Sequence, residues 1–159
     1  MRYYDSFESP HGRMLLVAAE KGVAGIYFNR QKYFPEPKKE WKRDGRHAVL
    51  QQAKRELREY FAGKRKRFDV ALAPDGTPFQ RSVWRAISSV GFGKTITYGE
   101  LAAKAGCPGS ARAAGAATGR NPIGIIVPCH RIVGANGSLT GYAGGLERKR
   151  ALLALEGAR

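Results

Sequence analysis

The sequence predicts an α+β protein in two parts, a small α+β unit over residues 1–75 and a mainly helical unit over residues 76–159. Two apolar runs near the N-terminus are separated by turn residues, which is typical of a β-hairpin. Apolar residues then recur at helical spacing. Beyond a break at Pro74, Asp75 and Gly76, two helix-start motifs follow, and these favour helices in the second part.

The N-terminal unit is expected to contain three strands and one helix. The strands are predicted over 14–19, 23–28 and 68–72. Residues 46–62 place their apolar side chains on one face of a helix that stops at Gly63. Two segments rich in lysine and arginine, 32–44 and 64–67, are expected to be solvated loops. A phosphate-binding role for 64–67 is the less favoured alternative.

The second unit begins with a helix capped by Thr77, with proline at its first position. Its apolar residues predict an inward stripe, and Trp84 beside them is expected in the core. The members of that stripe are Phe79, Val83, Ile87 and Val90.

Two short helices follow in a helix-turn-helix pattern. Thr97 and Glu100 form a capping box for the first, which ends at Gly106, and Ser110 is a suitable N-cap for the second, over 111–118. A tight turn containing glycine joins them, as in DNA-binding helix pairs.

The second of these helices is rich in alanine and glycine, and Arg112 is its one side chain suited to bidentate bonds with base edges. One interpretation buries this helix against the core. We favour the other, in which small residues let the backbone approach DNA closely and phosphate and shape contacts supply affinity.

Charge points to a polyanionic partner. The chain has 28 Lys and Arg against 13 Asp and Glu, a net charge of +15. Nucleic acid is the first candidate and an anionic membrane surface the second. The N-terminal residues are polar and charged, and no run of about 18 apolar residues occurs, so we expect a cytoplasmic protein that does not enter a membrane.

Cysteine and histidine usage predicts free thiols and no metal. Cys107 and Cys129 are expected to be reduced in the cytosol. The three histidines, at 11, 47 and 130, are scattered, and no paired-cysteine spacing occurs, so neither a metal nor another cofactor is expected.

The most informative stretch surrounds Cys129. An apolar run over 123–127 predicts a short buried strand that Pro128 ends, after a turn at Asn121 and Pro122. A thiol just past a buried strand lies at a pocket floor, where His130 could hold it as thiolate. The alternative is an inert core cysteine, which is the commoner case for an isolated pair.

The final helix is predicted over 146–156, with an apolar face made by Leu146, Leu152, Leu153 and Leu155. Glu156 lies in its last turn, where a carboxylate opposes the helix dipole. A protonated or hydrogen-bonded His130 would compensate. A solvated terminal glutamate is the alternative.

Taken together, these residues closely resemble the O6-alkylguanine-DNA alkyltransferase family. The resemblance rests on Asn121 and Pro122 followed by Pro128, Cys129, His130 and Arg131, and on collinear matches at 97–99, 142–145 and Glu156. It is strongest over 79–157. The resemblance implies an RNase H-like N-terminal subdomain and a winged-helix-like C-terminal subdomain that docks in the minor groove.

The resemblance also implies a role for each matching residue. Cys129 would accept the alkyl group, His130 would act as base through a water, and Glu156 would orient that histidine, while Asn121 shapes the site. Tyr98 would press on the target phosphate and donate a proton to guanine. Contacts with DNA or the flipped base are implied for Ala111, Arg112, Gly115, Ile132, Tyr142 and Ala143.

The implied activity is irreversible, single-turnover transfer of an alkyl group from O6-alkylguanine, and from O4-alkylthymine, to Cys129 after base flipping. We expect a monomer on double-stranded DNA, and the sequence leaves cooperative binding open. The alternatives are a damage-binding protein without catalysis and a cysteine hydrolase, for which no oxyanion hole is visible in the sequence. Cys107 has no role in this pattern.

Overall fold

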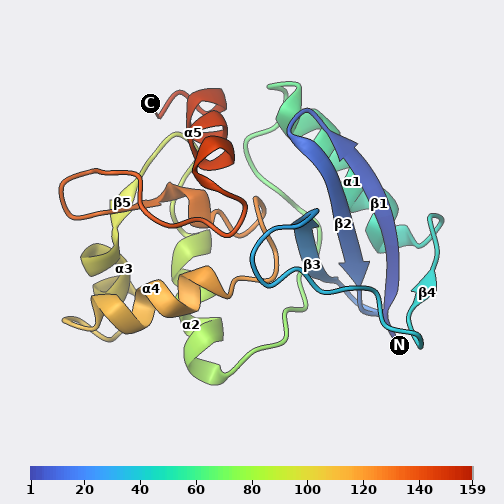
Figure 1. The fold of residues 1–159 in the computed structure, drawn as a ribbon, viewed down its shortest axis with the longest axis horizontal. Helices are drawn as coiled ribbons and strands as arrows, with labels where there is room; N and C mark the ends of the chain where they lie inside the picture. Colours follow the sequence, from blue (N-terminus) through green and yellow to red (C-terminus); the bar gives the residue numbers. More distant parts are fainter. Residues whose placement is uncertain (159) are drawn as a thin grey trace. The chain divides into compact units, whose positions relative to one another are not determined.

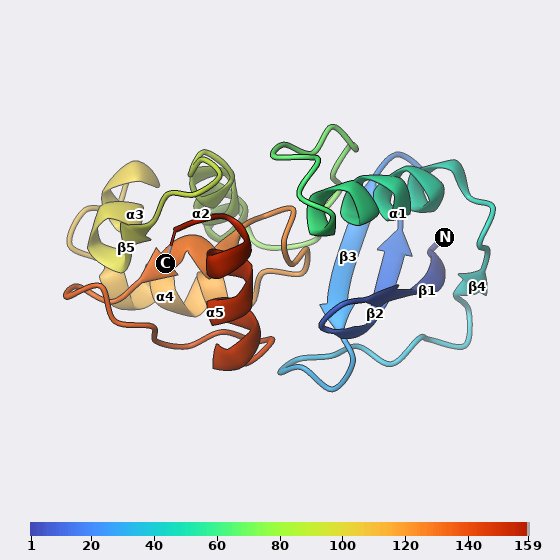
Figure 2. The same cartoon turned by 90° about the horizontal axis from the view of Figure 1, so that it is seen from above.

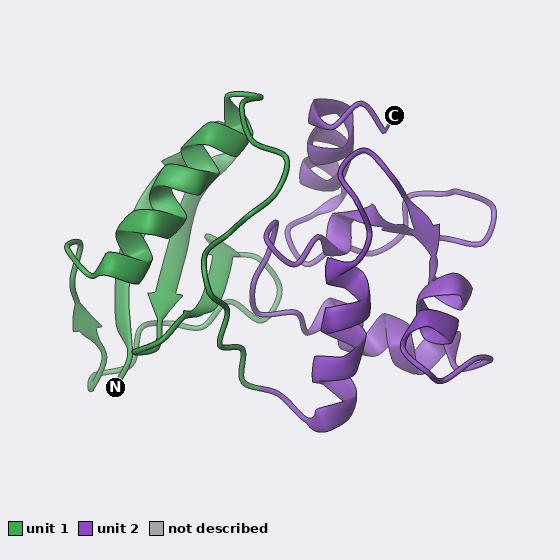
Figure 3. Ribbon diagram, turned by 180° about the vertical axis from the view of Figure 1, so that it is seen from behind, with its two compact units in different colours: residues 1–75 green, residues 76–159 purple. Residues whose placement is uncertain are grey.

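The computed structural model describes residues 1–158 and divides into two compact units, residues 1–75 and residues 76 onward (Figure 3). The first unit holds a four-stranded sheet and one long helix, α1 (Ala48–Phe61). The second holds the helices α2 to α5 and a pair of two-residue strands. This arrangement confirms the predicted α+β fold class.

The sheet has the strand order β3-β2-β1-β4 (Figure 1). Strands β2 (Gly12–Ala18) and β3 (Val23–Phe28) pair antiparallel and confirm the predicted hairpin. Strand β1 (Tyr3–Ser9) pairs antiparallel with β2, and β4 (Lys42–Arg43) pairs parallel with β1. Neither was predicted. The sequence of β1 lacks the apolar alternation of a typical strand, and Phe7 is its one buried residue.

The predicted strand over 68–72 is wrong. Its contact with the sheet is an isolated parallel bridge between Leu72 and Val23. The reason lies in α1: the buried carboxylate of Glu56 accepts the backbone N–H groups of Asp69 at 2.8 Å and Val70 at 3.1 Å. A side chain therefore satisfies the backbone that a neighbouring strand would otherwise pair.

Both faces of the sheet are covered within the first unit (Figure 2). Helix α1 lies across one face and buries the side chains of Leu50, Ala53, Leu57 and Tyr60. The segment over 29–41 runs below the other face, where Phe34 and Trp41 pack on a smaller cluster made by Leu15, Val17 and Ala24. The outer side of α1 remains uncovered by its own unit (Figure 3).

The second unit confirms three predicted helix starts, two of them with complete side-chain caps. Helices α2 (Pro78–Ser88) and α3 (Tyr98–Lys104) begin with complete capping boxes at Thr77 and Thr97. Helix α4 (Ala111–Gly119) begins directly after Ser110 as predicted, but the Ser110 side chain makes no cap hydrogen bond. The φ of −102° and ψ of 44° at Ser110 depart from the extended backbone seen at the two working caps.

Helix α2 contacts both α3 and α4. Trp84 lies in the core as predicted, and its indole N–H donates to the carbonyl oxygen of Ala117 in α4 at 2.9 Å. Val83, Ile87 and Val90 are also buried, whereas Phe79 in the first turn is 40% exposed, against the prediction. The first turn of α2 therefore reaches beyond the core that the rest of the helix contacts.

Helices α3 and α4 pack against each other and form the predicted helix-turn-helix (Figure 1). Strands β5 (Ile96–Thr97) and β6 (Ile132–Val133) pair parallel beside them. Helix α5 (Leu146–Leu155) ends at Glu156, its C-cap residue. The β5–β6 pair places the start of α3 next to the segment that follows Cys129.

Candidate active site

Cys129 opens a single 3₁₀ turn, Cys129–Arg131, and the run before it is not a strand. Residues 123–127 form a buried turn in which Ile125 has a φ of +69°, a rare value for a β-branched residue. Asn121 holds this turn: its side-chain oxygen accepts Ile123 N–H at 2.9 Å and its amide donates to the Val127 carbonyl at 2.9 Å. One amide side chain thus replaces the pairing that a strand would need.

The Cys129 sulfur is reached by the same amide. The Nδ2 of Asn121 lies 3.3 Å from Sγ, and the residue is 8% exposed. Burial raises the pKa of the Cys129 thiol above its ordinary value, while the Asn121 hydrogen bond and the positive charge of Lys149 lower it. The resting structure favours a neutral thiol over the thiolate that the sequence suggested.

His130 is fully buried and forms a pair with Glu156. Its Nε2 lies 2.7 Å from Oε2 of Glu156. Burial lowers the pKa of His130, an effect that the Glu156 carboxylate opposes. A carboxylate can only accept, so a neutral imidazole donates its Nε2–H here and leaves Nδ1 with a lone pair. Among residues 1–158, no protein group bonds to that buried Nδ1.

Arg131 is part of the sequence motif, but its role at the site is seen only in the structure. Its Nε donates to Oε1 of Glu156 at 2.8 Å, its Nη2 donates to Oε2 at 3.0 Å, and its Nη1 donates to the carbonyl of Val90 at 2.6 Å. The carboxylate of Glu156 is therefore stabilised by two neighbouring residues, the hydrogen-bonded His130 that was predicted and the positively charged Arg131. The sequence signal for a further partner was Glu156 itself, because a carboxylate at the C-terminal end of a helix is unfavourable. Nothing in the sequence limited its compensation to His130.

Lys149 is a second residue whose role at the site is seen only in the structure. It lies on α5 with no exposed surface, and its ammonium donates to the carbonyls of Ile132 at 2.6 Å, Thr140 at 2.8 Å and Gly141 at 3.2 Å. Leu146, which the sequence placed on the buried face, is 44% exposed. The buried face is instead Lys149, Leu152, Leu153 and Glu156, whose spacing of three, one and three is helical. That spacing was the available signal.

Tyr98, the first residue of α3, lies close to the same loop. Its hydroxyl donates to the carbonyl of Thr140 at 3.4 Å, the oxygen that Lys149 also binds. A Cβ placed on Gly115 in α4 would lie 3.6 Å from the Tyr98 ring, so glycine lets the helix pass close to this ring. Burial raises the pKa of Tyr98. The structure thus brings together Tyr98, Gly115 and the loop that precedes Tyr142.

The other predicted contact residues differ in exposure. Arg112 projects from the first turn of α4 and is exposed, without an ion pair to any described residue. Ala111, Tyr142 and Ala143 are half-buried, and each is reachable from solvent. Ile132 is fully buried in β6, so its side chain does not reach the surface.

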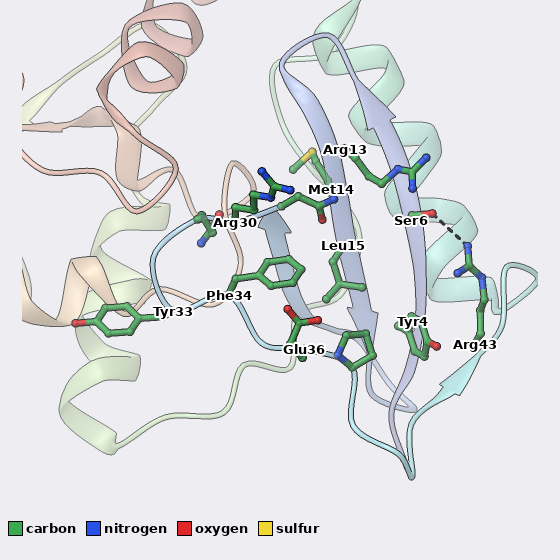
Figure 4. A pocket seen from close by; sticks show the side chains of 13 residues that line it. Tyr4, Ser6, Arg13, Met14, Leu15, Arg30, Tyr33, Phe34, Glu36 and Arg43 are labelled. Carbon is green, nitrogen blue, oxygen red and sulfur yellow. Dashed lines mark hydrogen bonds between the residues drawn. The ribbon is translucent and has the colours of Figure 1, made fainter.

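A cavity of about 570 Å³ lies in the other unit and contains none of the predicted site residues (Figure 4). It lies between the strands β1 and β2 and the segment over 29–37, with Tyr4, Leu15 and Phe34 among its walls. Two of its arginines are already paired, Arg13 with Glu8 and Arg43 with Asp5. Its lining includes no cysteine or histidine, so this cavity is not the candidate active site.

The described residues contain neither a metal-binding cluster nor a helix that could span a membrane. Residues 1–158 contain no group of three or more His, Cys, Asp or Glu side chains placed to hold a metal ion. None of the helices in that range combines the length and apolar composition needed to cross a bilayer.

Comparison with known proteins identifies the family. The 6-O-methylguanine DNA methyltransferase, DNA binding domain model matches residues 78–158, and the ribonuclease-like domain model of the same family matches residues 2–74. The methylated-DNA–protein-cysteine methyltransferase of Methanosarcina acetivorans is 50% identical over 155 residues, 98% of each chain.

Solved structures agree with this match. The Mycobacterium tuberculosis O6-methylguanine methyltransferase has a TM-score of 0.89 at 45% identity, over 100% of this chain and 94% of that one. The M. tuberculosis OGT in complex with DNA has a TM-score of 0.90 at 43% identity, over 98% and 93%. The chain therefore belongs to the 6-O-methylguanine DNA methyltransferase family, and DNA is its partner.

Proposed function

We propose that this chain repairs DNA by moving an alkyl group from O6-alkylguanine, and from O4-alkylthymine, onto Cys129. The observation that carries the proposal is the relay beside that cysteine, in which Glu156 holds Nε2 of His130 at 2.7 Å and leaves Nδ1 as a buried acceptor. The relatives that match the whole chain are named methylated-DNA–protein-cysteine methyltransferases, and we propose that the transfer occurs without turnover.

The chemistry begins from two neutral groups, since burial raises the pKa of the Cys129 thiol and lowers the pKa of the His130 imidazole. We propose that the thiol proton passes through a bridging water to Nδ1, and that Glu156 stabilises the resulting imidazolium. The buried charge of Lys149 and the amide of Asn121 favour the thiolate once it forms. Desolvation keeps that thiolate strongly nucleophilic.

The transfer step is a displacement at the alkyl carbon. A bond forms between Sγ and that carbon while the bond from carbon to O6 breaks, and guanine leaves with the electron pair. The Tyr98 hydroxyl is proposed to supply the proton that the departing base needs, and to regain one from solvent. The product is a thioether, which water does not readily cleave, so we propose that each molecule acts once.

Delivery of the base requires the nucleotide to leave the stack, at a cost of a few kcal/mol. Arg112 is proposed to fill the gap, and its side chain supports that role because it is exposed near the N-terminus of α4 and pairs with no other residue in the range 1–158. Ala111 and Gly115 on α4 are proposed to contact DNA, while Tyr142, Ala143 and the backbone near Ile132 border the flipped base. A monomeric state and a cytoplasmic location stay predictions.

Intact mass spectrometry after mixing with a duplex that carries O6-methylguanine tests the proposal. We expect a stoichiometric gain of one methyl group that peptide mapping places on Cys129. Cys107→Ala provides a matched control, because it removes the other thiol and should transfer normally. Cys129→Ala should bind the duplex without gaining mass. Binding of the unmodified protein without a mass gain would overturn the proposal in favour of a damage-binding protein without catalysis.

A further inference from the structure

The N-terminal unit carries a large share of the positive charge without a function to explain it. Residues 1–75 contain 17 lysines and arginines against ten aspartates and glutamates, an excess of seven in a net charge of +15. The helix pair and the candidate active site lie in the other unit. The charge of the first unit is therefore a separate feature that the alkyl transfer does not account for.

The acidic residues near α1 are occupied by structural contacts. Glu56 is 1% exposed and accepts two backbone N–H groups, and Glu59 pairs with Arg65 at 2.8 Å. Asp5 pairs with Lys54 and, at 3.1 Å, with Arg43. These carboxylates are paired with Lys54, Arg43 and Arg65 or with backbone groups, and not with Arg55 or Arg58. Glu59, four residues after Arg55 on α1, is half-exposed, and its carboxylate is paired with Arg65 rather than with Arg55 or Arg58.

The outer face of α1 is cationic. Gln51, Arg55 and Arg58 are exposed at spacings of four and three, so they lie along one line of the helix. With Lys54 and the backbone at Gly45 they line a surface depression of about 380 Å³. Within residues 1–158, the guanidinium groups of Arg55 and Arg58 have no ion pair, hydrogen bond or ring contact. We call Gln51, Arg55 and Arg58 the α1 stripe.

We propose that the α1 stripe is a second contact surface for the DNA backbone, distinct from the helix pair α3–α4. Neighbouring positions on a helix face are about 5–6 Å apart, so Arg55 and Arg58 can each bind a phosphate along one strand. A guanidinium presents paired N–H donors that match phosphate oxygens, and the amide of Gln51 adds an uncharged donor. The proposal requires no base contact and predicts no sequence preference.

DNA is favoured over other polyanions because it is the partner of the covalently linked second unit. A linked unit meets its second ligand site at a high local concentration, so weak phosphate contacts add usefully to affinity. The cavity of Figure 4 differs in kind, because its Arg13 and Arg43 already have carboxylate partners. The proposal rests on DNA binding alone and stands apart from the transfer chemistry.

The test compares two double variants of the full chain that remove the same charge from the same unit. Arg55→Ser/Arg58→Ser changes the α1 stripe, and Lys38→Ser/Lys39→Ser changes two exposed loop lysines. Affinity for an undamaged labelled duplex is measured between roughly 50 and 200 mM NaCl. We expect the slope of log affinity against log salt to become shallower by about 1 to 2 for the arginine variant alone.

Methyl transfer at saturating duplex should be unchanged in both variants, which separates this test from that of the proposed function. Equal slopes for the two variants would overturn the proposal, because charge anywhere on the unit would then have the same effect. An unchanged DNA slope together with lost binding to phosphatidylglycerol vesicles would also overturn it, in favour of a membrane surface.

A second measurement does not depend on a variant that folds. The wild-type protein is treated with an arginine-specific dicarbonyl reagent, with and without duplex, and the modified peptides are mapped. We expect duplex to protect Arg55 and Arg58 and to leave Arg30, an exposed arginine of the same unit, reactive. Equal modification of Arg55 and Arg58 with and without duplex would overturn the proposal.

Discussion

Replacement of Arg131 by methionine is the sharpest test of the site as a structural unit. The change removes two hydrogen bonds to Glu156, at 2.8 and 3.0 Å, and one to the carbonyl of Val90 at 2.6 Å. The volume of the side chain is largely kept. The carboxylate of Glu156 remains buried with His130 and the backbone N–H of Gly93, which donates at 3.2 Å, as its partners.

Breaking one side of a buried ion pair typically costs about 3–5 kcal/mol, because the other charge is left without compensation. Glu156 keeps two partners, so we expect the lower end, about 3 kcal/mol. For a chain of this size that corresponds to a fall in Tm of roughly 6–12 °C. The charge of Arg131 also lowers the pKa of His130, so the pKa of His130 should rise in the variant.

Chemical and thermal denaturation followed by circular dichroism measures the effect. Arg85→Met is the matched control, because Arg85 is exposed on α2 and should change stability by no more than about 0.5 kcal/mol. Glu156→Gln/Arg131→Met removes both charges and should be less destabilised than the sum of the single variants. A cost for Arg131→Met equal to that of Arg85→Met would refute the reasoning that this ion pair is buried and coupled.

Three further predictions concern pH, the thiol and the helix packing. Burial lowers the pKa of His130 below 6.5, so the unfolded chain binds the proton first and stability should fall as pH drops below 6.5. Burial raises the pKa of Cys129 above 9.0, so the unfolded chain loses its proton first and stability should also fall as pH rises above 9.0. The urea midpoint against pH measures both, and a midpoint that stays constant across either limit contradicts the assignment. Lys149→Met removes a charge that lowers the pKa of the Cys129 thiol, so iodoacetamide should alkylate that thiol more slowly at a given pH, and a shift of the pH–rate profile to lower pH would count against it. Trp84→Phe removes the indole donor from the buried carbonyl of Ala117, which keeps the backbone N–H of Arg120 at 3.2 Å as a donor. The variant should therefore cost about 1 kcal/mol in denaturant unfolding, with an unchanged midpoint as the contrary result.

Local signals in the sequence were reliable where neighbours along the chain decide the structure. The capping boxes at Thr77 and Thr97 form as predicted, because each cap bonds within four residues. The hairpin of β2 and β3 likewise follows from two apolar runs and a short turn. Trp84 in the core follows from helical spacing.

The same signals failed where a side chain competes for the backbone of a predicted strand. The runs over 68–72 and 123–127 both have the composition of strands. Glu56 binds the backbone of the first, and Asn121 binds the backbone of the second, so neither pairs as a full strand. A propensity is a preference of the residue itself, and a buried hydrogen bond to a side chain outweighs it.

What the sequence determined by itself was the fold class, the two working caps and the family, because these depend on periodicity, short-range bonds and a collinear motif around Cys129. The tertiary structure alone decided which charges are buried. Arg131 and Lys149 are ordinary surface residue types in sequence, and they become part of the site only because Glu156 and three backbone carbonyls are brought to them from distant segments. Burial of a charge is favourable only when its partners surround it, and that condition is set by the folded chain as a whole.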